Sequence, residues 1–133
     1  MKNSLCLSII EMGGYPNFAP LYQSFDFQTE TLFNMRKAQG WLKKNQPILV
    51  VAEFHFDPDM RDRMSTLESL LASLQRYAPN ARVITFIEKE FHPRFMAVQT
   101  RYPHLIAAVE YPINEDKLKL VLEHHLEEIK NAG

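Results

Sequence analysis

The chain has 133 residues, of which 46% are hydrophobic and 23% are charged, and this balance is typical of one folded domain rather than a disordered chain. The net charge of -1 leaves no basic excess for phosphate contacts, so we expect no nucleic-acid partner. The longest apolar runs, Ile48–Ala52 and Leu105–Val109, have five residues each, so we expect no membrane-spanning segment.

Five short apolar runs along the chain have the composition of strands that are buried on both faces. In chain order they are Leu5–Ile10, Thr29–Phe33, Ile48–Phe54, Val83–Ile87 and Leu105–Val109. The run at Thr29–Phe33 is the weakest of the five, and its prediction depends on its place in the alternation of strands with helices.

Helical patterns occupy the segments after these runs. Asn17 is expected to cap a short helix with Phe18, Leu21, Tyr22 and Phe25 inward, and Asn34 is expected to cap a second that ends at Leu42. The remaining helices are predicted at Ser65–Tyr77, with Ser65 and Glu68 as a capping box, at Pro93–Tyr102, and at Glu115–Lys130 with Asn114 as cap. Five strand–helix repeats predict one α/β domain over residues 1–133, with a mostly parallel sheet covered by helices on both faces.

Two stretches give the sequence a resemblance to a known family. Pro47–Met60 is an apolar strand that ends in an acidic, proline-containing loop, and Ala107–Ile113 is a strand that ends in Tyr-Pro-Ile. In element order and in these stretches the chain resembles the CheY-like receiver domains of two-component response regulators. The resemblance implies a doubly wound, flavodoxin-like sheet of order 2-1-3-4-5 with five helices, and a cis bond between Tyr111 and Pro112.

The resemblance also implies which positions would hold the receiver's phosphorylation site. Such a site needs two acidic residues for Mg²⁺, an aspartate that accepts the phosphoryl group, a hydroxyl and a lysine. The equivalent positions here hold Glu11, Met12, Glu53, Ile87 and Tyr111, and Thr85 lies two residues before the hydroxyl position. A thioether does not suit a hard cation, and a phenol cannot neutralise an acyl phosphate as an ammonium does.

These departures predict a divergent pseudo-receiver that is not phosphorylated and that acts as a signalling or protein-interaction module. We expect neither enzymatic activity nor a cofactor, and the sequence does not identify the protein partner. Two alternatives stay open. One is an active receiver that accepts phosphate on a loop aspartate such as Asp57, and the other is a flavodoxin-like ligand-binding protein or enzyme that uses the crevice at the strand ends.

Glu53 has two interpretations. It could act as a permanent mimic of phosphoaspartate, or it could be a solvated carboxylate at a strand end, which we favour because no cationic partner for it is evident. Glu53 and His55 are two residues apart and should point to the same side. With Glu11 they could form a metal site, to which Glu88 and His92 could add ligands, but this spacing is loose and we predict no metal site.

Four further features are expected to be structural. His125 should be a buried neutral histidine bonded to a backbone carbonyl, and His124 should be solvated. Cys6, the single cysteine, should behave as a small buried hydrophobe, and its inability to form an internal disulfide favours a cytoplasmic protein. Gly13 and Gly14 should form an ordinary turn, and the charged segment from Asp57 to Arg63 a solvated connection.

The last two helices suggest an interaction surface. Leu120 falls opposite the buried stripe of the final helix, next to His124, and the preceding helix carries Phe95 and Tyr102. Because receiver-like proteins often pair through these helices, we expect a partner site or a weak two-fold homodimer that includes these residues. The alternative, a monomer with scattered surface hydrophobes, stays open.

Overall fold

The computed structural model describes residues 4–55 and 66–132. Strands and helices alternate along this part of the chain. The strands are β1 (Leu5–Ile9), β2 (Gln28–Leu32), β3 (Leu49–Glu53), β4 (Arg82–Ile87) and β5 (Leu105–Glu110). The helices are α1 (Ala19–Ser24), α2 (Met35–Leu42), α3 (Thr66–Tyr77), the 3-10 turn η1 (Lys89–Phe91), α4 (His92–Arg101) and α5 (Glu115–Ala132).

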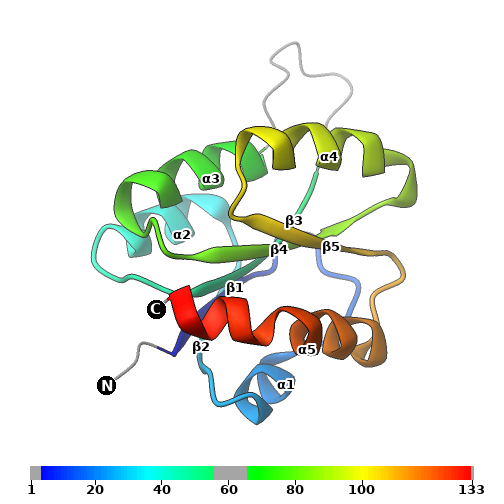
Figure 1. Cartoon of the computed structure of the whole chain (residues 1–133), viewed down its shortest axis with the longest axis horizontal. Helices are drawn as coiled ribbons and strands as arrows, with labels where there is room; N and C mark the ends of the chain where they lie inside the picture. Colours follow the sequence, from blue (N-terminus) through cyan, green and yellow to red (C-terminus); the bar gives the residue numbers. More distant parts are fainter. Residues whose placement is uncertain (1–3, 56–65, 133) are drawn as a thin grey trace.

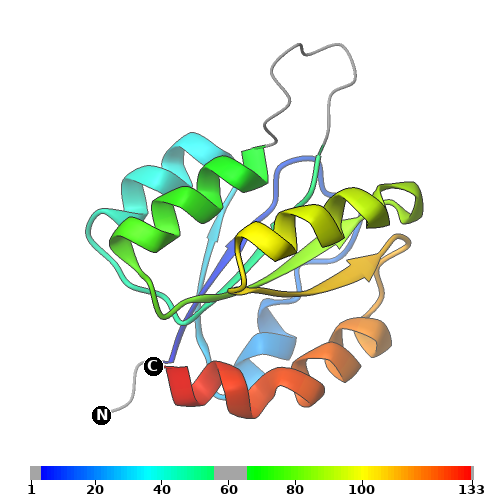
Figure 2. The same ribbon diagram turned by 45° about the horizontal axis from the view of Figure 1, so that its top comes forward.

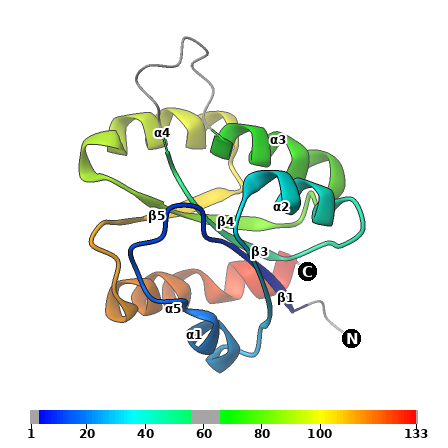
Figure 3. The same cartoon turned by 180° about the vertical axis from the view of Figure 1, so that it is seen from behind.

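The strands form one parallel sheet in the order β2-β1-β3-β4-β5 (Figure 1). Helices α2, α3 and α4 cover one face of the sheet, and α1 and α5 cover the other (Figures 2 and 3). The predicted doubly wound, flavodoxin-like fold is therefore confirmed, together with the strand order that the receiver resemblance implies. The weak strand prediction at Thr29–Phe33 is also confirmed, because β2 pairs with β1 along its whole length.

Strand β3 shows how the sequence pattern positions a site at the strand ends. All five of its residues are buried, as expected for an inner strand of a parallel sheet. Leu49 and Val51 pack in the cluster under α1 and α5, whereas Val50 and Ala52 pack in the cluster under α2, α3 and α4. Because side chains alternate along a strand, Glu53 continues the series that faces α1 and α5.

Two of the predicted caps are confirmed by hydrogen bonds. The Asn34 side chain accepts from the Lys37 amide at 2.7 Å, and that of Asn114 accepts from the Lys117 amide at 2.9 Å. The Asn17 side chain accepts from the Ala19 amide at 2.9 Å, although the residue that caps α1 is Phe18. Ser65, half of the predicted capping box, and the segment from Asp57 to Arg63 lie outside the described residues.

Helix α5 confirms the predicted buried stripe but not the predicted burial of His125. Leu118, Leu122 and Ile129 are fully buried, whereas Leu120 is 68% exposed. The prediction that His125 is a buried histidine bonded to a backbone carbonyl is wrong. Its side chain is 22% exposed, with Nδ1 3.6 Å from the Glu128 carboxylate one turn later. Because the His125 ring lies at the solvent boundary, water and the Glu128 carboxylate can interact with its nitrogens. This costs less free energy than burying the polar ring completely.

No helix within the described residues is both long enough and apolar enough to cross a bilayer. Cys6 is fully buried, as predicted, and its burial raises the pKa of its thiol.

Candidate functional site

Glu53 is the centre of a hydrogen-bond network at the carboxyl ends of the strands. It is the last residue of β3, between β1 and β4 in the sheet, and its side chain has no exposed surface. The expectation of a solvated carboxylate is therefore wrong. A buried carboxylate is stable only when hydrogen bonds or an opposite charge replace the water that it has lost. The alternative, that Glu53 mimics phosphoaspartate, stays a prediction.

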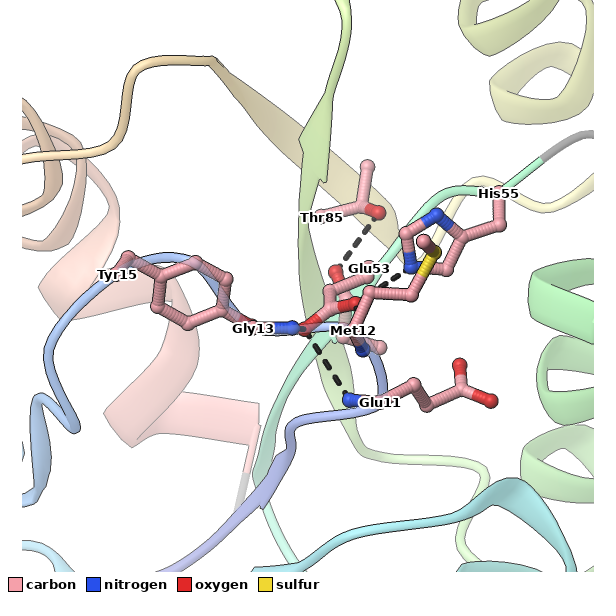
Figure 4. A network of polar contacts seen from close by, with 8 residues as sticks. Glu11, Met12, Gly13, Tyr15, Glu53, His55 and Thr85 are labelled. Atoms are coloured by element: carbon pink, nitrogen blue, oxygen red, sulfur yellow. Dashed lines mark hydrogen bonds and ion pairs between the residues drawn. The ribbon is translucent and has the colours of Figure 1, made fainter.

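Within the described residues, five donors from two segments surround the Glu53 carboxylate (Figure 4). Oε1 accepts from the Met12 amide at 2.9 Å and pairs with His55 Nε2 at 2.5 Å. Oε2 accepts from the amides of Glu11 and Gly13, each at 3.2 Å, and from the Tyr15 hydroxyl. A carboxylate offers about four lone-pair sites, so this network saturates it.

The β1–α1 loop is shaped to hold an anion. The amides of three consecutive residues, Glu11 to Gly13, all point at Glu53, which is the arrangement of a backbone anion nest. Gly13 and Gly14 have φ of 73° and 88°, a conformation that residues with a Cβ seldom adopt. The two glycines therefore form more than the ordinary turn that the sequence predicted, because the loop that they shape binds a carboxylate of the same chain.

The network shifts the pKa values of its members. Burial alone would raise the pKa of Glu53, but hydrogen bonds from His55, Tyr15 and the Met12 and Gly13 amides outweigh it and lower the pKa to about 2. The hydrogen bond to Glu53 raises the pKa of His55 above its ordinary value of 6.5, against the opposing effect of burial. Burial and the bond to Glu53 raise the pKa of Tyr15. The site thus contains an ionised glutamate paired with a readily protonated histidine.

Glu11 lies next to this network, but its side chain is not part of it. Its backbone amide binds Glu53, whereas its side chain points away from Glu53 (Figure 4). Oε1 of Glu11 is buried and has no hydrogen-bond partner among the described residues. Burial raises the pKa of Glu11, as does the charge of Glu53, while His55 lowers it.

Aromatic rings fill the space beside the network on the α1 and α5 side of the sheet. The Tyr15 ring lies edge-on to Phe86 at 4.9 Å, stacks against Phe18 at 6.0 Å and approaches Tyr111 at 6.2 Å, all between centroids. Phe86 is opposite Glu53 in the β3–β4 register. These contacts hold the Tyr15 hydroxyl against the carboxylate, since edge-on and offset ring pairs add to the packing energy.

A cleft of about 440 Å³ opens at the same end of the sheet. Its lining consists of Met12, Gly13, Gly14, Phe54, His55, Glu88, Phe91 and Tyr111. Glu53 itself does not line it, so the cleft meets the network through Met12, Gly13 and His55. Its volume falls within the range of roughly 300–1,000 Å³ that is usual for small-molecule sites.

The structure brings together some of the predicted receiver positions and separates others. Glu11, Met12 and Glu53 meet in the network, and Tyr111 lines the cleft and precedes Pro112 through the predicted cis bond. Ile87 is fully buried in the core. The Thr85 hydroxyl is also buried and donates to the Ala52 carbonyl at 2.9 Å, so it is bound within the sheet (Figure 4).

Sequence reasoning missed Tyr15 and the backbone donors. It noted that Glu53 and His55 share a side, and they do pair, which supplies the cationic partner that the sequence did not make evident. The sequence feature that could have indicated this loop is the glycine pair Gly13 and Gly14 next to Tyr15, shortly after a strand. No group of three or more metal-ligating side chains occurs among the described residues.

The four residues of the predicted interaction surface differ in exposure. Leu120 and His124 are exposed and Tyr102 is half-buried, but Phe95 is only 5% exposed because it packs on the core from α4. The large hydrophobic residue of α4 that is exposed is instead Met96, at 55%.

Comparison with protein-family models and with curated proteins finds no match for this sequence. Solved structures do match. A CheY-like receiver domain protein from Methanospirillum hungatei JF-1 has a TM-score of 0.66 and 12% identity, over 98% of this chain and 99% of that one. NtrX from Brucella abortus has a TM-score of 0.75 and 19% identity over 97% of this chain, which corresponds to 28% of NtrX.

A third similar structure is described as an adenylate cyclase from Rhodopirellula baltica. It has a TM-score of 0.68 and 14% identity, over 96% of this chain and 90% of that one. At these identities the likeness establishes the fold that the chain shares with CheY-like receiver domains.

The central role of Glu53 predicts the effect of replacing it. Glu53→Gln keeps the shape but removes the charge and turns an amide group toward backbone N–H donors. Because removing one partner of a buried ion pair leaves unsatisfied groups, we expect a loss of about 3–5 kcal/mol in the free energy of unfolding, measured in urea. Glu88→Gln, an exposed carboxylate at the rim of the same cleft, is the control and should change stability by less than about 0.5 kcal/mol. Equal effects of the two substitutions would contradict the network.

Proposed function

We propose that the chain is a signalling or protein-interaction module built on a receiver fold, and that it works without phosphorylation of Glu53. The observation that carries this proposal is the saturated Glu53 carboxylate, with five donors and no exposed surface. A carboxylate attacks a phosphoryl group through a free, accessible oxygen in line with the leaving group. Neither oxygen of Glu53 is available in that way.

The groups around Glu53 also differ from those that phosphoryl transfer requires. Met12 carries an uncharged thioether, and the residue is 78% exposed. Tyr111 is a neutral phenol whose pKa is raised by burial and by the charges of Glu53 and Glu88. Phosphoryl transfer depends on cations that neutralise the developing negative charge, and these two side chains supply none.

The Glu53 carboxylate holds the β1–α1 loop in a conformation that does not depend on a phosphodonor. The β1–α1 loop is organised around a carboxylate of the same chain. Because the anion is the Glu53 side chain, the surface next to the loop forms without phosphorylation. We infer that the protein's output comes from contacts that this surface, or the α4 and α5 surface, makes with another protein.

A second candidate function is ligand binding in the cleft beside His55. The volume of about 440 Å³ and the aromatic lining favour it. Phe54, Phe91 and Tyr111 would contact an apolar body, and Glu88 and His55 would bind polar groups. A small molecule that remains bound through purification, detected by mass spectrometry of the denatured protein, would favour this function over the interaction module.

Absence of phosphorylation is directly testable. Incubation with acetyl phosphate and Mg²⁺ should leave the intact mass unchanged, because neither oxygen of Glu53 is accessible. Beryllofluoride with Mg²⁺ should leave the amide NMR spectrum unchanged. A phosphorylatable receiver domain treated in parallel is the positive control. A gain of one phosphate on Glu53 would refute the proposal, and a gain on Asp57 would establish the alternative of an active receiver with an unusual acceptor.

The interaction surface predicts weak self-association that depends on Leu120. Burying an exposed leucine at a two-fold interface stabilises a dimer, and a charge at that position should abolish it. We expect wild-type protein to dimerise in sedimentation experiments at high concentration, and Leu120→Glu to remain monomeric. Phe33→Glu is the matched control, because Phe33 is 65% exposed but follows β2 at the opposite edge of the sheet. A wild-type monomer at every concentration would exclude the dimer.

A further inference from the structure

One donor to Glu53 differs from the other four, because its charge can change near neutral pH. Three donors are backbone amides, and the fourth is the Tyr15 hydroxyl, whose pKa is raised above its ordinary value of 10. The fifth is His55, and an imidazole ordinarily titrates between about pH 5 and 8. Its side chain is 31% exposed, so it can exchange protons with solvent.

The groups that face His55 favour its charged form. Glu53 on β3, Glu11 in the β1–α1 loop and Glu88 after β4 are carboxylates that act on the imidazole. Tyr111 after β5 lines the same cleft as a neutral phenol, and Phe54 and Phe91 are apolar. Lys89 and Glu90 of η1 are exposed and do not line the cleft. Among the described residues that line this cleft, His55 is therefore the one that can carry positive charge.

Loss of that charge changes the environment of a fully buried anion. While His55 is protonated, Glu53 has a cation within hydrogen-bond distance. A neutral imidazole can still donate one hydrogen bond, but it no longer balances the carboxylate. The other donors to Glu53 that the structure describes all belong to the β1–α1 loop. The cheapest way to rehydrate an unbalanced carboxylate is therefore to open this loop.

We propose that His55 is a protonation-controlled latch on the β1–α1 loop. The imidazolium keeps the loop closed on Glu53, and its deprotonation lets the three amide bonds break in a larger fraction of molecules. Met12, between the Glu11 and Gly13 amides, is highly exposed and lines the cleft, so opening the loop changes the surface that a partner or ligand meets. The protein would thereby present the open surface in a larger fraction of molecules when His55 is neutral.

Linkage gives the direction and the size of the effect. Contact with Glu53 raises the pKa of His55 above its ordinary value, so the latch is engaged at low pH and is lost as the pH rises through the raised value. Each unit by which the pKa in the closed loop exceeds that in the open loop increases the open fraction about tenfold at high pH.

Amide hydrogen exchange by NMR tests this latch in the intact protein. The reporters are the amides of Glu11, Met12 and Gly13, whose protection factors, corrected for intrinsic exchange, are measured between about pH 6 and 9. The internal control is the Lys117 amide, which also donates to a side-chain oxygen, that of Asn114, but far from the network. We expect protection of the reporters to be lost relative to the control as the pH rises through the His55 ring titration, measured in the same sample.

Two variants separate the latch from general pH effects. His55→Gln retains an N–H donor but cannot carry a charge, so reporter protection should stay low and independent of pH in this range. His124→Gln removes an exposed histidine of α5 and should behave as wild type. Constant reporter protection in wild type, a midpoint that differs from that of the His55 ring, or an unchanged pH dependence in His55→Gln would each overturn the proposal. If His55→Gln does not fold, the comparison of reporter and control amides across the pH range in wild-type protein still tests the proposal.

Discussion

A buried carboxylate at the end of the third strand is the constraint on which this end of the molecule depends. Taking an ionised glutamate out of water is costly, and five hydrogen bonds offset that cost at Glu53. Four of them come from the β1–α1 loop, so the same bonds that satisfy the charge also position the loop. The glycines with positive φ, the Tyr15 ring packing and the His55 pair all contribute to this one requirement.

The network is also the basis for proposing that this receiver-like fold functions without phosphorylation of Glu53. The nest of amides between Glu11 and Gly13 suits an anion, and Glu53 already supplies one. The rings of Tyr15 and Phe86 pack beside the carboxylate, and the nearby cation, His55, is already paired with Glu53. An aspartate, shorter by one methylene, would not reach the same donors with the same geometry. The glutamate and the loop are thus matched to each other.

Much of the fold could be predicted from the sequence, because its signals are local. The apolar run of β3 and the buried stripe of Leu118, Leu122 and Ile129 on α5 are set by periodicity, and the structure contains both. The order of the strands came from the family resemblance rather than from spacing. The prediction for His125 was wrong because helical periodicity gives the direction of a side chain but not how far the neighbouring layer extends over it.

The site was less predictable, because its donors are backbone amides that no residue type reveals. The spacing of Glu53 and His55 predicted that they point to the same side, but it did not reveal that they pair. The approach of Tyr15 depends on how a loop more than thirty residues earlier crosses the strand ends. The most direct test of this account is the pH titration of the Glu53 side-chain carboxyl carbon by NMR in the folded protein. The account predicts that Glu53 stays ionised as the pH falls through the ordinary glutamate range and titrates only near pH 2. A titration near the ordinary value of 4.5 in the folded protein would contradict it.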